Sequence, residues 1–523
     1  MPQAFKSMRE IETASRSALL PLRPHHFSIE VLSVWQPLGT SGSTSLPVDG
    51  ATGTLAARGH RCVPRNYVGD ESVNHTIPAV LRARRGVLAA LFACALTHAA
   101  AAQSEMQPVP AAESPTAPAP APTATLETGP EATELQLGAF SYGDSPDSVP
   151  AELDEIYTTR AGMFKIPVVD DALDAVVKAT LDLQDSTGLR IASAYTMVFQ
   201  QATGGPGTRY GSSGDFDLFG DWTLIGRGTA NSGRLVFGGE YRHRIGEQPA
   251  SALRGEIGSL QSTISGFNDR GWSLRDLYWI QNLFDGKLRL GFGRADSSDF
   301  VGGHRLGNLN ASFFNRAFAS NTTTNFPGHG MTAGASFRPT NWFYITGGAA
   351  NAYGVTTQSD LSDLDEGDFF SFGEVGFTPT IEGLGFGRYR AMAWHSDARE
   401  KDNVGSDRGF SIILEQDLGE IVQVFARYGY ADKGLAGIRS SFETGVGVRG
   451  LLGDNDNMTG AAFAYSEPPP GNSREEKIAE VFHRWQLTRY VQFSVSAQAI
   501  FDPSNAPDDD VLGVFSARLR LAF

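Results

Sequence analysis

Charged side chains recur at every second position in several segments of the C-terminal part of the sequence. Glu240, Arg242 and Arg244 form one such run, and Arg518 and Arg520 form another near the C-terminus. Guanidinium groups donate several hydrogen bonds and carboxylates accept several, so both together at a narrow point can replace part of the water shell of a polar solute. The candidate residues selected by alternation are Glu240, Arg242, Arg244, Arg254, Glu256, Arg289, Arg427, Glu480, Arg484, Arg518 and Arg520.

The segments that carry these residues alternate with a period of two, which is the periodicity of a β-strand. In residues 490–501, "YVQFSVSAQAIF", apolar side chains alternate with glutamine and serine. The final stretch, "VLGVFSARLRLAF" at 511–523, alternates over about thirteen residues, whereas globular strands usually have about five or six. From Leu189 onward we count sixteen or seventeen such segments, separated by clusters of Gly, Asp, Asn and Pro.

Residues 81–103, "LRARRGVLAALFACALTHAAAAQ", have the organisation of a secretory signal peptide. Three arginines precede a short apolar stretch, and three alanines provide a small-residue cleavage site. The apolar stretch is too short for a transmembrane helix. Because such signals act at the N-terminus, we expect translation to start near Val80 or Leu81. Residues 1–80 would then be a gene-calling artefact or a disordered extension, and residues 81–102 the signal peptide.

The exported part of the chain is predicted to have three regions. Residues 103–150 include a Pro/Ala/Thr-rich tract that cannot bury enough apolar surface to fold, so we expect a disordered linker. Residues 151–188 contain "PVVDDALDAVVKATLDLQDSTG", with apolar residues at helical spacing, and predict a short helical segment that lies in the periplasm or plugs a barrel. Residues 189–523 form the β domain.

The β domain is predicted to be all-β, a sixteen-stranded antiparallel transmembrane β-barrel. Within a bilayer every backbone polar group must be paired, and a closed sheet is the only solution built from strands. Short connections such as 284–287 and long acidic ones such as 502–510 predict an outer-membrane barrel with short turns on one rim and long loops on the other. A soluble sandwich would have shorter strands, and no fixed repeat indicates a β-helix. Both cysteines, Cys62 and Cys94, precede residue 103.

The two faces of the last strand would meet different surroundings. The apolar face that ends in Phe523 would face lipid, and Arg518 and Arg520 would face the lumen. A terminal aromatic residue is the feature by which barrels of this class are recognised for assembly, so we expect Phe523 to serve as the signal for the barrel-assembly machinery.

The charged residues have a second explanation that does not involve a solute. An Arg or Lys on the lipid face costs about 2–4 kcal/mol at mid-bilayer, so these side chains would face inward in any membrane barrel. Trp279, Trp342 and Trp394 also have two explanations, as stacking faces for a ring-shaped solute or as members of the aromatic girdles at the membrane interfaces. Both explanations stay open, and for the tryptophans we prefer the girdle.

Residues 271–303, "GWSLRDLYWIQNLFDGKLRLGFGRADSSDFVGG", resemble the carbohydrate-selective porin family called OprB-like. The resemblance consists of an aromatic-rich strand, the hairpin "LFDGKLRLGFGR" and the loop "ADSSDF". It continues through "NFPGHGMTAGASFRPTNWFYITGGAANA" and "GFSIILEQDL" to "EVFHRWQLTRYVQFSVSAQAIFDP", and it covers about residues 189–523. The loop motif departs from the family at Ala295 and Ser297–Ser298, and Arg484–Trp485 is a second departure.

The resemblance implies a sixteen-stranded porin that passes mono- and oligosaccharides down their gradient through a constriction lined by arginines and acidic residues. Residues 304–330 are the best candidate for a loop that folds into the pore, although their Asn, Ser and Thr content also suits exposure to solvent. The expected surroundings are the outer membrane of a Gram-negative bacterium, its lipid and its lipopolysaccharide. A homotrimer is an additional expectation.

Several other functions are excluded or less favoured. A net charge of −15 without a basic cluster excludes nucleic acid as a partner. No nucleophile elbow, zinc-helix signature or Cys/His pair indicates an enzyme, and neither a cofactor nor a metal is expected. The main alternative is a general or anion-preferring porin, since arginines also attract anions. A structural tether that uses the Pro-rich segment is a third possibility.

Overall fold

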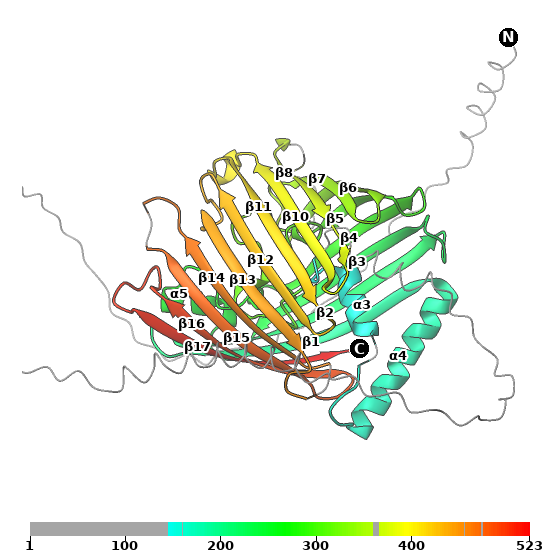
Figure 1. Ribbon diagram of the computed structural model, residues 1–523, viewed down its shortest axis with the longest axis horizontal. Helices are drawn as coiled ribbons and strands as arrows, with labels where there is room; N and C mark the ends of the chain where they lie inside the picture. The colour runs from blue at the N-terminus through cyan, green and yellow to red at the C-terminus, as the bar shows by residue number, and fades with distance from the viewer. Residues whose placement is uncertain (1–144, 159, 359–363, 365, 454–455, 472–473) are drawn as a thin grey trace, which may run out of the picture. The chain divides into compact units, whose positions relative to one another are not determined.

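The computed structural model describes residues 145–158, 160–358, 364, 366–453, 456–471 and 474–523. Within these ranges sixteen long antiparallel strands form one closed barrel (Figure 1). The strands are β1 (Leu189–Ala202), β2 (Tyr210–Ile225), β3 (Gly233–Arg244), β4 (Gly271–Leu283), β5 (Leu288–Ala295), β6 (Gly330–Thr340), β7 (Phe343–Asn351), β8 (Phe369–Phe377), β10 (Gly385–Ser396), β11 (Asp407–Leu418), β12 (Val422–Ala431), β13 (Ser440–Arg449), β14 (Met458–Glu467), β15 (Glu476–Gln486), β16 (Val491–Phe501) and β17 (Val511–Ala522).

Each strand pairs with the next along the chain, and the first pairs with the last. A two-residue strand, β9 (Thr380–Ile381), lies in the connection between β8 and β10, which pair directly with each other. β1 pairs with β17 from Ala194 opposite Ala522 onward. Ser193 and Phe523 then exchange two backbone hydrogen bonds of 2.8 and 3.0 Å. The predicted sixteen-stranded antiparallel barrel is therefore confirmed, and the terminal residue takes part in its closure.

The two rims of the barrel differ as predicted. Residues 284–287 and 487–490 make short turns at the end where β1 begins and β17 ends, which we call the short-turn rim. Residues 245–270, 296–329 and 502–510 connect strands at the opposite end, the long-loop rim.

The last strand shows how side chains divide between the two faces of the barrel wall. Phe515 is 58% exposed and Leu519 is 38% exposed on the outer face, whereas Arg518 and Arg520 are each 1% exposed on the inner face. Since side chains of a strand alternate, the outer surface is apolar and the charged side chains are enclosed, as predicted for β17.

Two long loops fold inward from the long-loop rim and fill part of the lumen. Residues 245–270 carry η2 (Ala250–Ala252) and α5 (Leu253–Ile257), and residues 296–329 carry η3 (Ser297–Asp299) and α6 (Arg316–Ala319). Phe267 of the first loop and Phe313, Phe314 and Phe318 of the second loop belong to one buried apolar cluster. The infolding of residues 304–330 was predicted from the sequence, whereas that of 245–270 was not. A further 3-10 turn, η5 (Glu400–Asp402), remains at the rim.

Two helices precede the barrel. α3 (Val149–Tyr157) lies inside the lumen at the short-turn end, and α4 (Pro167–Thr187) lies beside the short-turn rim near the C-terminus (Figure 1). Proline at the start of α4 suits a position that needs no backbone donor, and Gly188 with φ 79° ends the helix in the left-handed conformation. No helix among the described residues is both long and apolar enough to cross a membrane.

The predicted linker does not extend as far as residue 150. Ser145 and the following residues lie within the lumen, and Val149 and Pro150 already belong to α3. α4 occupies the stretch in which helical spacing was noted, but α3 was not recognised from the sequence. Residues 1–80, the predicted signal peptide at 81–102 and most of the predicted linker lie outside the described residues, as do Cys62 and Cys94.

Candidate functional site in the barrel lumen

Acidic side chains line one part of the lumen wall. On β2, Asp215 and Asp217 alternate with Phe216 and Leu218, so both carboxylates point inward, where each is at most 2% exposed. The register places Asp215 opposite Arg242 and Asp217 opposite Glu240 on β3. We call β2–β4 with these side chains the acidic wall.

Arginines pair with most of the carboxylates of the acidic wall. Arg242 Nε lies 2.8 Å from Asp215 Oδ2, and both Arg242 and Arg270 form ion pairs with Glu240. In contrast, Asp217 forms no ion pair with any described residue, and its Oδ2, like Asp215 Oδ1, has no hydrogen-bond partner among them. The acidic wall therefore keeps several enclosed carboxylate oxygens without a hydrogen-bond partner, and Asp217 is the acid of this wall that no arginine pairs with among the described residues.

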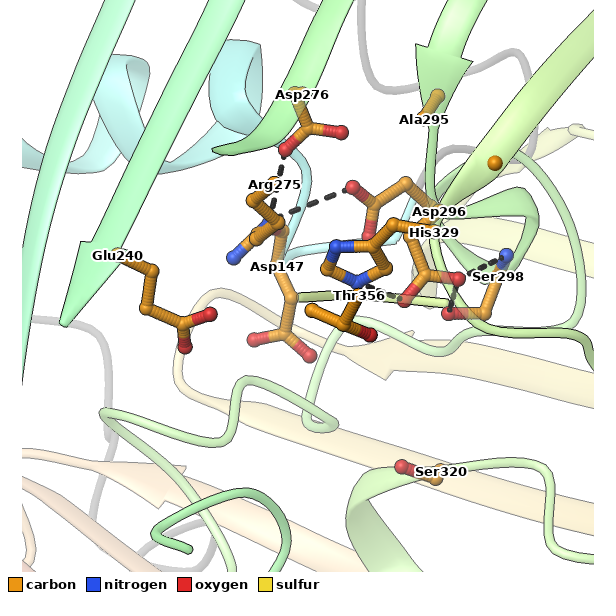
Figure 2. Close-up of polar contacts among 12 residues, drawn as sticks. Asp147, Glu240, Arg275, Asp276, Ala295, Asp296, Ser298, Ser320, His329 and Thr356 are labelled. Carbon is orange, nitrogen blue, oxygen red and sulfur yellow. Dashed lines mark hydrogen bonds and ion pairs between the residues drawn. The ribbon is translucent and has the colours of Figure 1, made fainter. Parts of the chain in front are cut away.

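A β-bulge adds two more charges to this wall. Gly238 pairs with Asp276 and Gly239 pairs with Leu274, so Arg275 is the extra residue on β4. As a result the neighbours Arg275 and Asp276 are both buried on the inner face. Arg275 Nε lies 2.9 Å from Asp276 Oδ2, and Figure 2 shows Arg275, Asp147 and Glu240 around the same part of the lumen.

The grouping of acids raises the question of a metal site. Ligand atoms of Asp215, Asp217 and Glu240 lie within 4.8 Å of one another, a spacing that a divalent cation with oxygen ligands could accept. Two guanidinium groups, those of Arg242 and Arg270, already neutralise Asp215 and Glu240. We therefore treat the group as an ion-pair network with one unpaired carboxylate.

Arginines dominate the remaining part of the wall, from β10 to β17. Their side chains are at most 9% exposed and point inward, and four buried glutamates accompany them. Arg388 pairs with Glu415, and Arg427 Nε lies 3.1 Å from Glu443 Oε2. The arginines of this basic wall are Arg388, Arg390, Arg427, Arg484, Arg518 and Arg520, and its glutamates are Glu415, Glu443, Glu476 and Glu480.

The basic wall holds the loop 296–329 in the lumen through backbone atoms. Arg427 donates to the carbonyls of Ala317 and Ser320, and Arg484 donates to the carbonyl of Ala311. Arg518 donates to the carbonyls of Leu309 and Ser312, each at 2.7 Å.

Glu480 complements these arginines by accepting hydrogen bonds from the same loop. Its carboxylate accepts from the backbone N–H groups of Phe314 and Asn315 at 2.8 and 2.9 Å. The path of the loop across the lumen is thus fixed by charged side chains that bind its backbone.

Small wall residues let the loop pack directly against the sheet. A Cβ atom added to Gly429 on β12 would lie 2.1 Å from Thr323 Oγ1, and one added to Gly447 on β13 would lie 2.8 Å from Leu306 Cδ2. Both glycines lie where the loop contacts the wall.

A second group of contacts orders the start of the loop. Asp296 accepts from the backbone N–H and the hydroxyl of Ser298 at 2.9 and 2.8 Å, and His329 Nε2 lies 3.0 Å from Asp296 Oδ2 (Figure 2). Burial opposes ionisation, but the hydrogen bonds from His329 and Ser298 hold the pKa of Asp296 below its ordinary value. Asp296 is thus the N-cap of η3, and Ser298 donates to it.

His304 in the same loop is a structural residue. Burial lowers the pKa of His304 to about 3, so the ring is neutral. One ring nitrogen lies 2.6 Å from the carbonyl of Phe318, and the ring stacks on Phe425 at 4.0 Å.

The predicted site residues fall into three groups. Glu240, Arg242 and Arg289 point into the lumen, and Arg289 lines a cavity with Thr332, Ser336 and Thr346. Four others position the infolded loop, namely Arg427, Glu480, Arg484 and Arg518. Arg520 forms the third group and binds α3.

Three predicted residues lie elsewhere. Arg244 lies at the long-loop rim with its side chain 58% exposed, next to Asp269. The strand expected around Arg254 and Glu256 is wrong, because both residues lie on α5, where residues two apart no longer share a face. Glu256 accepts a hydrogen bond from the backbone of Thr208 and so holds a neighbouring loop.

Some lumen residues were missed, for identifiable reasons. Asp215 and Asp217 obey the period of two in "GDFDLFGD" and could have been found by the alternation that was applied to other strands. Arg275 and Asp276 could not have been found in this way, because the β-bulge on β4 interrupts the period of two. Among the tryptophans, Trp394 lies on the inner face against Phe370.

Comparisons with known proteins agree with this architecture. A family model described as "Carbohydrate-selective porin, OprB family" matches residues 177–523. A search of curated proteins finds no match.

Among solved structures, that of Pseudomonas putida OprB at high pH covers 70% of this chain and 100% of its own, with 15% identity and a TM-score of 0.57. The low-pH structure of that protein has the same coverage, 14% identity and a TM-score of 0.44. OccK11 (OpdR) of Pseudomonas aeruginosa covers 64% of this chain and 96% of its own, with 11% identity and a TM-score of 0.41. The first of these likenesses supports the porin fold.

The match to the family model covers more than half of the chain and coincides with the closed barrel. The chain therefore belongs to the OprB family of carbohydrate-selective porins, passive channels of the bacterial outer membrane that are not enzymes.

Proposed function

We propose that neutral carbohydrates diffuse through this porin along the acidic wall and past the inner surface of the loop 296–329. The observation that carries the proposal is the composition of the acidic wall, where carboxylates and guanidinium groups are paired and Asp217 keeps an unpaired oxygen. Such a surface offers donors and acceptors to sugar hydroxyls while its charges largely cancel.

The roles of individual residues follow from their contacts. Glu240, Arg242 and Arg289 would engage the solute, because they face the lumen and lie outside the loop-anchoring group. Arg427, Glu480, Arg484 and Arg518 would set the width of the passage by holding the loop. Binding has to remain weak, because a solute that is held tightly cannot leave the channel.

A general or anion-preferring porin is the alternative, and the basic wall favours it. Six arginines face four glutamates on β10–β17, and hydrogen bonds to carbonyl groups do not cancel the charge of an arginine. The two functions differ in whether the solute is selected by its hydroxyl groups or by its charge.

Single-channel recording of the purified porin in a planar bilayer separates the two functions. We expect glucose at low millimolar concentration to reduce the ionic current, and the D217N variant to be blocked less well than the wild type. D432N is the matched control, because Asp432 lies at the long-loop rim with its side chain 48% exposed. Indifference to glucose together with a marked preference for anions would overturn the proposal.

The remaining proposals concern the surroundings of the barrel. We place it in a Gram-negative outer membrane, as a homotrimer with lipopolysaccharide around the long-loop rim. The support for recognition of Phe523 by the barrel-assembly machinery is that its backbone completes the ladder between β17 and β1. Crosslinking in native membranes tests the trimer, and a monomeric pattern would contradict it.

A further inference from the structure

An apolar patch faces inward at the short-turn end of the lumen. It consists of alternate residues of neighbouring strands, Phe219 on β2, Val236 on β3 and Tyr278 and Ile280 on β4, each at most 2% exposed. In a pore filled with water such a patch would be exposed, so its presence on the inner face of the wall needs a covering element.

α3 covers this patch. Val149 and Leu153 of the helix are 0% exposed and belong to the same apolar cluster, with Ile156 and Tyr157 packed against it. The hydroxyl of Tyr157 donates a 2.9 Å hydrogen bond to the carbonyl of Ile191 on β1. Because the apolar side of α3 packs against this patch, the helix is held in the lumen by burial of apolar surface.

The polar side of α3 carries three acidic residues that meet arginines of the wall. Glu152 and Glu155 each lie 2.6 Å from the guanidinium group of Arg520 on β17. Asp154 lies 2.6 Å from Arg190 on β1. The helix thus brings negative charge to the part of the lumen where the basic wall meets the short-turn rim.

α3 is also connected to the infolded loop. The backbone N–H of Leu309 donates to Asp147 Oδ1 at 2.9 Å, and the side chain of Asn308 donates to Glu152 Oε1 at 2.9 Å. Ser145 N donates to the carbonyl of Asp299 at 2.8 Å. Through these contacts α3 and the loop 296–329 form one continuous lining of the passage.

We propose that α3 sets the charge selectivity of the pore, by placing Glu152, Asp154 and Glu155 against wall arginines that would otherwise favour anions. This inference rests on the proposed function and deepens it, because it gives the reason why an arginine-lined channel can serve neutral solutes. α3 lies outside residues 177–523, so the match to the family model does not account for it.

Reversal potentials in a KCl gradient across a planar bilayer test the proposal on the full chain. In E152Q/E155Q we expect the chloride-to-potassium permeability ratio to rise about three- to tenfold, since the guanidinium group of Arg520 would lose both of its carboxylate partners. D182N/D185N on α4 is the matched control, with the same change in formal charge on a helix outside the lumen, and should leave the ratio unchanged.

A second variant guards against loss of folding. L153D introduces a charge into the apolar contact between α3 and the wall, so we expect α3 to leave its position, and both conductance and anion preference to rise. Resistance of the barrel to detergent at room temperature reports folding. An unchanged permeability ratio in folded E152Q/E155Q and folded L153D would overturn the proposal.

The same bilayers separate this inference from the proposed function. If glucose fails to block the wild type but E152Q/E155Q still shifts toward anions, the sugar pathway is wrong and the role of α3 stands. If glucose blocks the wild type and neither variant changes ion selectivity, the role of α3 is wrong and the sugar pathway stands.

Discussion

Replacement of Arg518 by alanine should loosen the loop 296–329 and widen the passage. The guanidinium group of Arg518 donates 2.7 Å hydrogen bonds to the carbonyls of Leu309 and Ser312, and it lies 4.2 Å from the centre of the Phe314 ring. One side chain therefore contacts three points of a loop segment that has no strand partner of its own.

The cost of the R518A substitution can be worked from these contacts. A hydrogen bond from a charged group contributes about 1.5–3 kcal/mol, and an exposed cation–π contact contributes about 0.5–1 kcal/mol. Water can reach the freed carbonyl groups in a lumen, so we take the lower ends of these ranges and expect a loss of about 3.5 kcal/mol in the attachment of the loop. Such a loss increases the population of the detached loop by about three hundredfold, since each 1.4 kcal/mol corresponds to tenfold.

Liposome swelling with sugars of increasing size measures the width of the passage. We expect R518A to admit oligosaccharides that the wild type excludes, and its single-channel current to become larger and noisier. R518K keeps the charge but loses the planar fork, so it should show an intermediate size limit. R408A is the control, because Arg408 is 74% exposed at the long-loop rim, where a surface ion pair contributes little.

An unchanged size limit in R518A, with the same current noise as R408A, would refute the reasoning. It would mean that the apolar cluster around Phe313 and Phe318 holds the loop without the arginine.

Further predictions concern single positions. Burial, together with the charge of Glu152, raises the pKa of Asp147 from 3.8 to about 7. Between these values the folded state holds a proton on Asp147 that the unfolded state releases. The free energy of unfolding should therefore fall as pH rises from about 4 through 7. The thermal transition of D147N in detergent should depend less on pH over this window than that of the wild type, and equal dependence would contradict the assignment. G429V should lower the current or displace the loop, because the new side chain would overlap Thr323; a wild-type current and size limit would show that the loop does not approach β12. Deletion of Phe523 removes the two backbone hydrogen bonds to Ser193 and should reduce the yield of heat-modifiable barrel in membranes, whereas F523W should preserve it.

The barrel itself could be predicted from the sequence because its cause is local. Alternation in residues 511–523 reports which side chain faces which surroundings, and the same rule holds for each strand that contains no irregularity. The rims could be predicted for a similar reason, since the length of a connection is read directly from the chain. The length and polarity of residues 304–330 were enough to predict that this loop folds into the pore. They did not indicate which residues anchor the loop.

The lumen was harder to predict because its contacts join distant parts of the chain. Arg520 meets Glu152 and Glu155 across more than 360 residues, and no periodicity in either segment reports the other. The sequence therefore identified Arg520 as a lumen residue but predicted that it contacts the solute. In the structure its hydrogen-bond partners are Glu152 and Glu155 of α3. Arg254 and Glu256 show a different error. Their spacing of two residues predicted a strand, but both residues lie on the short helix α5.

The bulge at Arg275 shows why the site is less predictable than the wall. Strict alternation would place Arg275 and Asp276 on opposite faces, one in the lumen and one toward lipid, where a charge costs several kcal/mol. A single extra residue on β4 removes that cost by turning both inward, and it sets an arginine beside the acids of β2 and β3. The irregularity that defeats the period of two thus completes the charge balance of the acidic wall, which is the feature on which the proposed passage of neutral sugars depends.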